Sequence, residues 1–125
     1  MVGENRLGDE GTTILCEALR ESTVSKVEEL DLSRNDIGPK GAKAIAALCA
    51  ARGSLTSISL FGNDFDDESV ATLLKVKEEK PTLVTLCGLT LDQTEANFTG
   101  WNLAPADAKL LAPEMLVHGS LTKIS

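Results

Sequence analysis

Aromatic residues, histidine and basic residues are scarce in this sequence of 125 residues. It has one Trp, three Phe and no Tyr, an aromatic fraction of 3%, so any core must be built mainly from aliphatic side chains. Nineteen acidic residues against twelve basic ones give a net charge of -7, a sign that disfavours binding to the phosphate backbone of nucleic acids. No apolar run approaches the roughly 18 residues of a membrane-spanning helix, and no secretory signal peptide is recognisable. We therefore expect neither nucleic acid nor a membrane as a partner.

Cysteine and histidine are too few and too widely spaced for a zinc site. The cysteines are Cys16, Cys49 and Cys87, and the one histidine, His118, has no second imidazole to act with. No CxxC pair exists, and an odd number of cysteines at irregular spacing does not predict a disulfide framework. We interpret the cysteines as small apolar residues of a cytoplasmic protein in a reducing compartment, with a reactive or regulatory thiol as the alternative. The sequence predicts no metal and no other cofactor.

Motifs of the common enzyme classes are also missing. The chain has no GxSxG, no phosphate-binding Walker loop and no GxGxxG after a strand. The single histidine has no Cys or Ser within plausible reach by repeat position. We therefore predict a protein that is not an enzyme.

What the sequence does have is an internal repeat. Residues 27–38 are matched by 55–66 at an offset of 28 residues, and 83–86 repeat the opening of the same unit. Residues 103–124 match 37–58 without a gap at an offset of 66, and the N-terminus matches part of the unit as well. Such a period predicts a single repeat domain over 1–125. Its expected units are 1–26 (partial), 27–54, 55–82, 83–92 (without a helix), 93–120 and 121–125 (partial).

Each unit changes its hydrophobic period halfway. In the first half, Leu30 and Leu32 alternate with polar residues, as in a half-buried strand. In the second half, apolar residues recur at three- and four-residue spacing around Ile45, as on the buried face of a helix. Leu111 takes the position of Ile45 in the last unit. The pattern predicts strands at 27–33, 55–61, 83–87, 95–99 and 121–125, and helices at 9–19, 41–51, 67–78 and 105–117.

The alternation of strand and helix also predicts the arrangement in space. Successive strands must lie parallel, because a helix links each strand to the next. Parallel strands are roughly 4.8 Å apart whereas packed helices need about 8–10 Å, so the stack bends with its strands inside. We therefore predict an α/β fold, a right-handed solenoid with parallel strands on the concave side and helices on the convex side. Asn35 and Asn63 follow the strands, where their amides can satisfy the backbone of tight turns.

One stretch departs from this pattern. Leu83 and its expected successor Gln93 are only ten residues apart, too few for a strand, a helix and two turns, so residues 83–98 have lost the helical half of the unit. We expect 83–86 and 95–98 to be two extended pieces joined by a loop at about 88–93. Whether these pieces pair side by side or are splayed is open at this point. Trp101 stands where the unit has its Asn, and it either packs on the neighbouring coil or is exposed for binding.

The unit LxxLxLxxNxIGxxGAxxIAxxL resembles the leucine-rich repeat, in the long variety of the ribonuclease inhibitor. This variety also occurs in the Ran GTPase-activating protein and in the sensor arms of NOD-like receptors. The residues in pattern are Leu30, Leu32, Asn35, Ile37, Gly38, Gly41 and Ile45. The match is looser in 55–82, where Asp66 and Ser69 replace two glycines. The resemblance implies a curved solenoid, or horseshoe segment, that binds another protein through its concave strand face and the adjoining turns.

The outward positions of the predicted strands are the candidate binding residues. This surface is expected to be acidic at one end and lined by small hydroxyls in the middle, with Phe61 as an outward aromatic anchor. The alternative is that it is only a solvated polar face. The candidate residues are Glu29, Asp31, Ser33, Ser57, Ser59, Phe61 and Thr85, and the same face includes Cys87, Lys123 and Ser125.

Three other functional hypotheses follow from the residues and the family. The acidic group at 64–68 allows a calcium site, but it lacks the spacing of an EF-hand loop, and helix capping by Asp66 or Asp67 explains it without a metal. The family allows a GTPase-activating module, for which Arg6, Arg34 and Arg52 are the candidate arginines, with Arg34 in the turn just before Asn35. The third hypothesis is a purely structural segment of a longer repeat protein.

The repeat pattern also predicts incompletely covered ends. Leu15 and Leu19 on the first helix have no preceding coil, and Leu121 and Ile124 form the last strand. Because each coil of a solenoid buries its face on the next, we expect a fragment of a longer protein or self-association through these ends.

Overall fold

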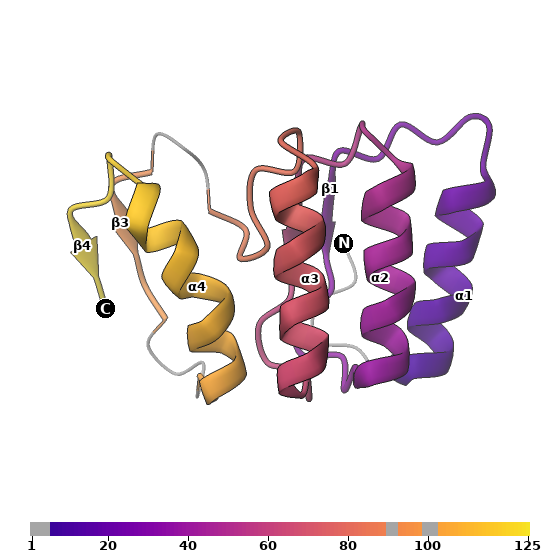
Figure 1. Ribbon diagram of the computed structural model, residues 1–125, viewed down its shortest axis with the longest axis horizontal. Coiled ribbons are helices and arrows are strands. Elements are labelled where there is room, and N and C mark those ends of the chain that lie inside the picture. Colours follow the sequence, from indigo (N-terminus) through magenta and orange to yellow (C-terminus); the bar gives the residue numbers. More distant parts are fainter. Residues whose placement is uncertain (1–5, 90–92, 99–102) are drawn as a thin grey trace.

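The computed structural model describes residues 6–89, 93–98 and 103–125, which alternate between helix and strand along the chain. Figure 1 shows the helices side by side in one layer, with the strands in a second layer against them. α1, α2 and α3 run nearly parallel, whereas α4 is tilted against α3 (Figure 1). The elements are α1 (Gly8–Glu21), β1 (Glu29–Asp31), α2 (Pro39–Ala51), β2 (Ser57–Ser59), α3 (Asp67–Glu79), β3 (Glu95–Ala96), α4 (Pro105–Val117) and β4 (Lys123–Ile124).

The strands pair in parallel with the register that the repeat predicts. Leu30 of β1 lies opposite Ile58 of β2, and Ala96 of β3 lies opposite Ile124 of β4, an offset of 28 residues in both pairs. The strands are shorter than predicted. After β1, for example, the backbone soon leaves the extended conformation. Arg34 already has a left-handed φ of 54°. Single hydrogen bonds nevertheless continue the pairing past β1, from the Leu32 N–H to the Ser59 carbonyl over 2.9 Å.

The aliphatic side chains predicted to point inward form the core between the two layers. Leu32, Ile45, Ile58 and Leu60 are each 0% exposed, and Leu30 is 8% exposed. The predicted inward orientation of the strands and the burial of Ile45 are therefore confirmed. Burying aliphatic side chains of this kind contributes about 1.5–3 kcal/mol each.

Asparagine side chains hold the turns between coils, as the sequence predicts. Asn63 Oδ1 accepts hydrogen bonds from the backbone N–H groups of Asn35 and Ile37, at 3.0 and 3.1 Å. Its Nδ2 donates to the carbonyls of Leu32 and Leu60, at 2.9 and 3.0 Å. One buried amide thus satisfies four backbone groups from two adjacent coils and locks their register.

The acidic group at 64–68 contains a helix cap. The Asp66 side chain accepts a hydrogen bond of 2.8 Å from the Ser69 N–H at the start of α3. Hydrogen bonds from Ser69 lower the pKa of Asp66 below its usual range. Helix capping therefore accounts for this carboxylate.

The stretch predicted as a strand at 83–87 pairs with β2 but forms no regular strand. Thr85 and Cys87 make single bridges to Ser57 and Ser59 of β2. Backbone hydrogen bonds also join Val84 to Thr56, Ile58 to Thr85 and Leu60 to Leu86. β3 pairs with β4, so in the described part of the chain the two extended pieces belong to different sheets. Of the two arrangements that the sequence left open, paired side by side or splayed, the structure therefore has the splayed one.

The last coil also differs in which helix face it buries. Leu110 is 0% exposed, whereas Leu111, predicted to replace Ile45, is only half-buried. The reason is that α4 directs Asp107 and Glu114 inward on the same face as Leu110. Through Glu114, this face of α4 contacts the stretch at 83–89.

The ends of the described coil are partly covered. Leu15, Leu19 and Leu121 are half-buried, and Ile124 is 56% exposed. Self-association through the ends stays a prediction. Trp101 lies outside the described residues.

Candidate functional site

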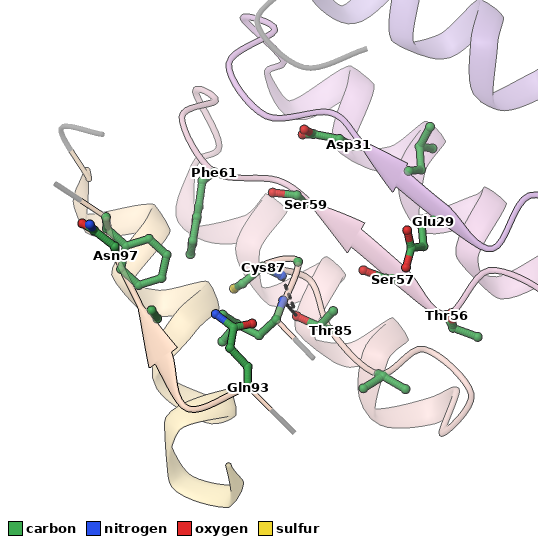
Figure 2. Close-up of a pocket in the computed structure, with 16 residues that line it drawn as sticks. Glu29, Asp31, Thr56, Ser57, Ser59, Phe61, Thr85, Cys87, Gln93 and Asn97 are labelled. Atoms are coloured by element: carbon green, nitrogen blue, oxygen red, sulfur yellow. Dashed lines mark hydrogen bonds between the residues drawn. The ribbon is translucent and has the colours of Figure 1, made fainter. Parts of the chain in front are cut away.

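A hollow of about 550 Å³ lies on the strand face, where the regular sheet gives way to the irregular stretch. Figure 2 shows its lining side chains, with Glu29 and Asp31 on one side and Phe61 and Asn97 on the other. β1, β2 and the segments 83–89 and 93–98 contribute to its walls. The lining residues are Glu29, Leu30, Asp31, Thr56, Ser57, Ser59, Phe61, Val84, Thr85, Cys87, Gly88, Leu89, Gln93, Ala96, Asn97 and Phe98.

The acidic end of the hollow comes from the outward side chains of β1. Glu29 is exposed and Asp31 is half-buried, and neither forms an ion pair with another described residue. Asp31 accepts hydrogen bonds from the backbone N–H and the hydroxyl of Ser33, at 3.0 and 2.6 Å. Ser33 is therefore only 3% exposed and absent from the lining, so the prediction that it is an outward surface residue is wrong.

Phe61 forms part of the opposite wall, but it is not the exposed anchor that the sequence predicts. Its side chain is 1% exposed. The ring packs edge-to-face against Phe98, with centroids 5.2 Å apart and an interplanar angle of 88°. The prediction of an outward, accessible Phe61 is corrected because the segment 93–98 returns beside it and covers the ring. Such a pair is worth about 0.5–1.5 kcal/mol beyond the area that it buries.

Thr85 and Cys87 also prove to be buried, at 1% and 6% exposure, where outward positions are predicted. The reason is that the Thr85 side chain turns toward the protein and organises its own backbone. Its hydroxyl donates to the Glu114 carboxylate and accepts from the N–H groups of Cys87 and Leu89, at 2.9 and 3.2 Å. Thr85 is therefore a structural residue at the floor of the hollow.

Burial keeps the three thiols protonated and so disfavours nucleophilic chemistry. Desolvation raises the pKa of Cys16 to about 11 and, with a smaller contribution from Cys16, raises that of Cys49 to about 12. Burial also raises the pKa of Cys87 strongly, and the nearby Glu114 carboxylate adds to this. The thiolate is the reactive form, so these cysteines behave as apolar core residues.

Two buried acidic residues on α4 that the sequence pattern does not mark as functional hold the backbone beside the hollow. Glu114, 5% exposed, accepts hydrogen bonds from the Thr85 hydroxyl and from the Leu86 N–H, the latter at 3.0 Å. Asp107, 1% exposed, accepts from the N–H groups of Gly62 and Ala104, at 3.0 and 2.8 Å. Their repeat positions correspond to the buried Gly41 and Leu48, so an acid at a core position was the signal that could have found them.

The remaining candidates divide into two groups. Ser57 and Ser59 are half-buried and line the hollow beside Glu29 and Asp31, as predicted for one surface. Lys123 and Ser125 are exposed but do not line it. Within 6–89, 93–98 and 103–125, no three potential ligands among His, Cys, Asp and Glu come together to hold a metal ion.

Comparison with known proteins gives the family of this chain. The family model described as leucine-rich repeat matches residues 25–46 and 54–74, the units with the clearest period. The chain is a leucine-rich-repeat protein of the ribonuclease-inhibitor type. The repeats account for the solenoid of alternating helices and short parallel strands.

Two relatives of this leucine-rich-repeat chain are much longer than the matched stretch. It is 38% identical over 90 residues to the bovine (Bos taurus) NACHT, LRR and PYD domains-containing protein 5, covering 68% of this chain and 8% of the relative. It is 28% identical over 83 residues to RAN GTPase-activating protein 2 of Arabidopsis thaliana, covering 66% of this chain and 15% of the relative. None of the helices that the structure describes is long and apolar enough to cross a membrane.

Proposed function

We propose that this protein is a non-enzymatic scaffold that binds another protein through its strand face and the adjoining turns. In this proposal the strands form the concave side of a right-handed horseshoe segment in an intracellular, reducing compartment. The observation that carries the proposal is the hollow of about 550 Å³, which combines the carboxylates of Glu29 and Asp31 with apolar walls on the strand face. Proteins of this repeat family generally mediate protein–protein interaction.

The construction of the hollow supports binding more than chemistry. The floor of the hollow is held by backbone pairing and by the hydrogen bonds of Thr85 and Glu114, so the hollow is formed before a partner binds. A preformed surface reduces the entropy cost of association. The thiol in its lining, Cys87, is held in its protonated form by burial, which leaves recognition as the role of the surface.

A pull-down with a blocked hollow tests this proposal. In the Ser57→Trp variant, a large side chain from β2 fills the hollow, whereas Ala50→Trp adds the same side chain to the exposed face of α2. We expect proteins retained by the wild type and by Ala50→Trp to be lost from Ser57→Trp, with circular dichroism confirming that both variants are folded. Retention of the same proteins by Ser57→Trp would contradict binding through this face.

A GTPase-activating module is the second candidate, and one observation favours it. Arg34 lies in the turn after β1, and its side-chain stem lies so close to Gly62 that an added Cβ there would come within 2.8 Å of Arg34 Cγ. The arginine is thereby positioned at the edge of the strand face, and one relative is a RAN GTPase-activating protein. GTP hydrolysis by Ran and a panel of small GTPases, with wild type and Arg34→Ala, tests this candidate. Acceleration that Arg34→Ala abolishes would establish it.

A purely structural segment of a longer repeat protein is the third possibility. The matched stretch makes up only 8% and 15% of the two relatives. In that case neither Ser57→Trp nor Arg34→Ala changes any binding or hydrolysis, while both remain folded.

A further inference from the structure

We propose that the hollow recognises an extended peptide segment that carries a lysine or arginine and, about three residues away, a large apolar side chain. The inference rests on the proposed function and names the chemistry of its partner. The first argument is charge. Among the described residues, the lining contains two carboxylates, Glu29 and Asp31, and no lysine, arginine or histidine. Complementary charge at such a rim guides association and suppresses acidic partners.

The second argument is the apolar character of the hollow at the end opposite Glu29 and Asp31. There Leu89 and Phe98 line the hollow together with Phe61, whereas Val84 lines it farther along β2, next to Thr56. An apolar side chain inserted between these walls would be removed from water on several sides, which is the environment of an interface anchor. The segment 93–98 bounds this end, and an extended segment fits between the two walls more readily than the surface of a folded domain.

The spacing of the two ends sets the spacing in the peptide. Glu29 is on β1, β2 lies next to it, and 83–89 follow beside β2. Two strand spacings of roughly 4.8 Å separate the acidic end from the apolar one by about 10 Å. An extended chain advances about 3.3 Å per residue, so a peptide crossing the strands covers this distance in about three residues.

Recognition through side chains is favoured because the sheet edge at 85–89 is already satisfied. The N–H of Leu86 donates to Glu114, and those of Cys87 and Leu89 donate to the Thr85 hydroxyl. A peptide cannot pair with these groups as an added strand without displacing them. The peptide is therefore held by its charge and its apolar side chain across the strands.

Selection from a phage-displayed library of random peptides on the immobilised 125-residue chain tests this inference. We expect the enriched peptides to combine Lys or Arg with a large apolar residue about three positions away. For a selected peptide, the isosteric Glu29→Gln/Asp31→Asn variant should weaken binding about tenfold. Added salt should weaken binding to the wild type in the same way, because it screens the same charges. The control Glu21→Gln/Glu78→Gln, which removes the same charge from the exposed helix ends, should change the affinity less than about twofold.

The outcomes separate this inference from the proposed function. Peptides without a basic residue, lost from Ser57→Trp but not from Glu29→Gln/Asp31→Asn, overturn the inference and leave binding through the strand face standing. Peptides that bind Ser57→Trp as well as wild type count against both. Failure to enrich any peptide overturns recognition of an extended segment, while the pull-down decides the proposed function independently.

Discussion

Two regions of this solenoid keep the same strand register with different sets of side chains. In the regular region, from α1 to α3, the amide of Asn63 links two coils through four backbone groups, and Asp9 on α1 accepts hydrogen bonds of 2.8 Å from the N–H groups of Gly38 and Gly41 in the next coil. In the irregular region, the carboxylates of Asp107 and Glu114 on α4 bind the backbone of the preceding coil. An offset of 28 residues is kept in both. The comparison shows that the register depends on satisfying the turn backbone and not on one residue type.

The helix layer shows the same contrast. Gly41 lets α2 approach its own turn and α1, because an added Cβ would come within 2.4 Å of Ile37 Cγ2 and 2.8 Å of Asp9 Oδ1. α4 has Asp107 at this repeat position, and Figure 1 shows it tilted against α3. At this repeat position a small residue thus permits close helix packing in one region, whereas in the other Asp107 needs its polar partners, the N–H groups of Gly62 and Ala104.

The amide link should be the most sensitive feature of the regular region. Asn63→Ala leaves the buried N–H groups of Asn35 and Ile37 without their acceptor, each at a cost of about 1–3 kcal/mol. We expect the free energy of unfolding to fall by about 2–6 kcal/mol in urea denaturation. Asn63→Asp keeps the acceptor but sets a buried carboxylate oxygen against the carbonyls of Leu32 and Leu60, so it should be destabilised as well. A loss below about 1 kcal/mol in Asn63→Ala would contradict the role of this amide in joining the coils.

The core of the regular region comes next. Ile45→Ala removes a side chain that is 0% exposed and should lower the free energy of unfolding by about 2–5 kcal/mol, because it leaves a cavity. Ser57→Ala on the half-buried strand face should change it by no more than about 0.5 kcal/mol. Thermal or urea denaturation measures both. Similar shifts for the two variants would be incompatible with the assignment of inside and outside.

The carboxylate link is the corresponding test in the irregular region. Glu114→Gln retains the shape but replaces one acceptor oxygen by an N–H₂ group, so the Leu86 N–H or the Thr85 hydroxyl loses its acceptor. We expect a loss of about 1–3 kcal/mol. Native-state hydrogen exchange should accelerate first at Leu86 and Cys87, while the Leu32 and Arg34 amides stay protected. Uniform acceleration would show that the two regions open as one unit.

The buried thiols give an effect that is seen only at alkaline pH. The pKa of Cys16 is raised from 9.0 to about 11 and that of Cys49 to about 12, so above pH 9 the unfolded chain releases protons that the folded chain retains. The free energy of unfolding should therefore fall as the pH rises above 9.0, at up to about 1.4 kcal/mol per pH unit for each thiol.

Urea denaturation under reducing conditions at a series of alkaline pH values measures this slope. In the Cys16→Ala/Cys49→Ala variant the slope should become shallower, whatever the change in absolute stability. A slope equal to that of the wild type would contradict the protection of these two thiols by burial.

Much of the regular region could be predicted from its residues. Helices near 9–19, 41–51, 67–78 and 105–117 are present, and Leu30, Ile45 and Ile58 are buried as predicted. These features depend on hydrophobic periodicity over a few residues, which favours the same local structure in every unit. In the irregular region the period is lost, and the stretch predicted as a strand at 83–87 pairs with β2 only through isolated bridges and single hydrogen bonds.

Only part of the candidate site could be predicted from the sequence. Strand alternation alone places Glu29, Ser57 and Ser59 on the outer face, and all three line the hollow. The same rule fails at Phe61 and Thr85, because what covers an outward residue is set by distant segments. Phe98 packs on Phe61, and Glu114 binds Thr85 from α4.

The sequence by itself determined the repeat, its register of 28 residues and the aliphatic core, since these follow from local periodicity and from the need to bury apolar surface. Only the tertiary structure decided that the sheet divides after Cys87 and that two carboxylates on α4 bind the backbone of the preceding coil there. It also decided that this division leaves a hollow with an acidic and an apolar end. The physical reason is that a buried polar group must find its partner in space, and that partner can lie anywhere along the chain.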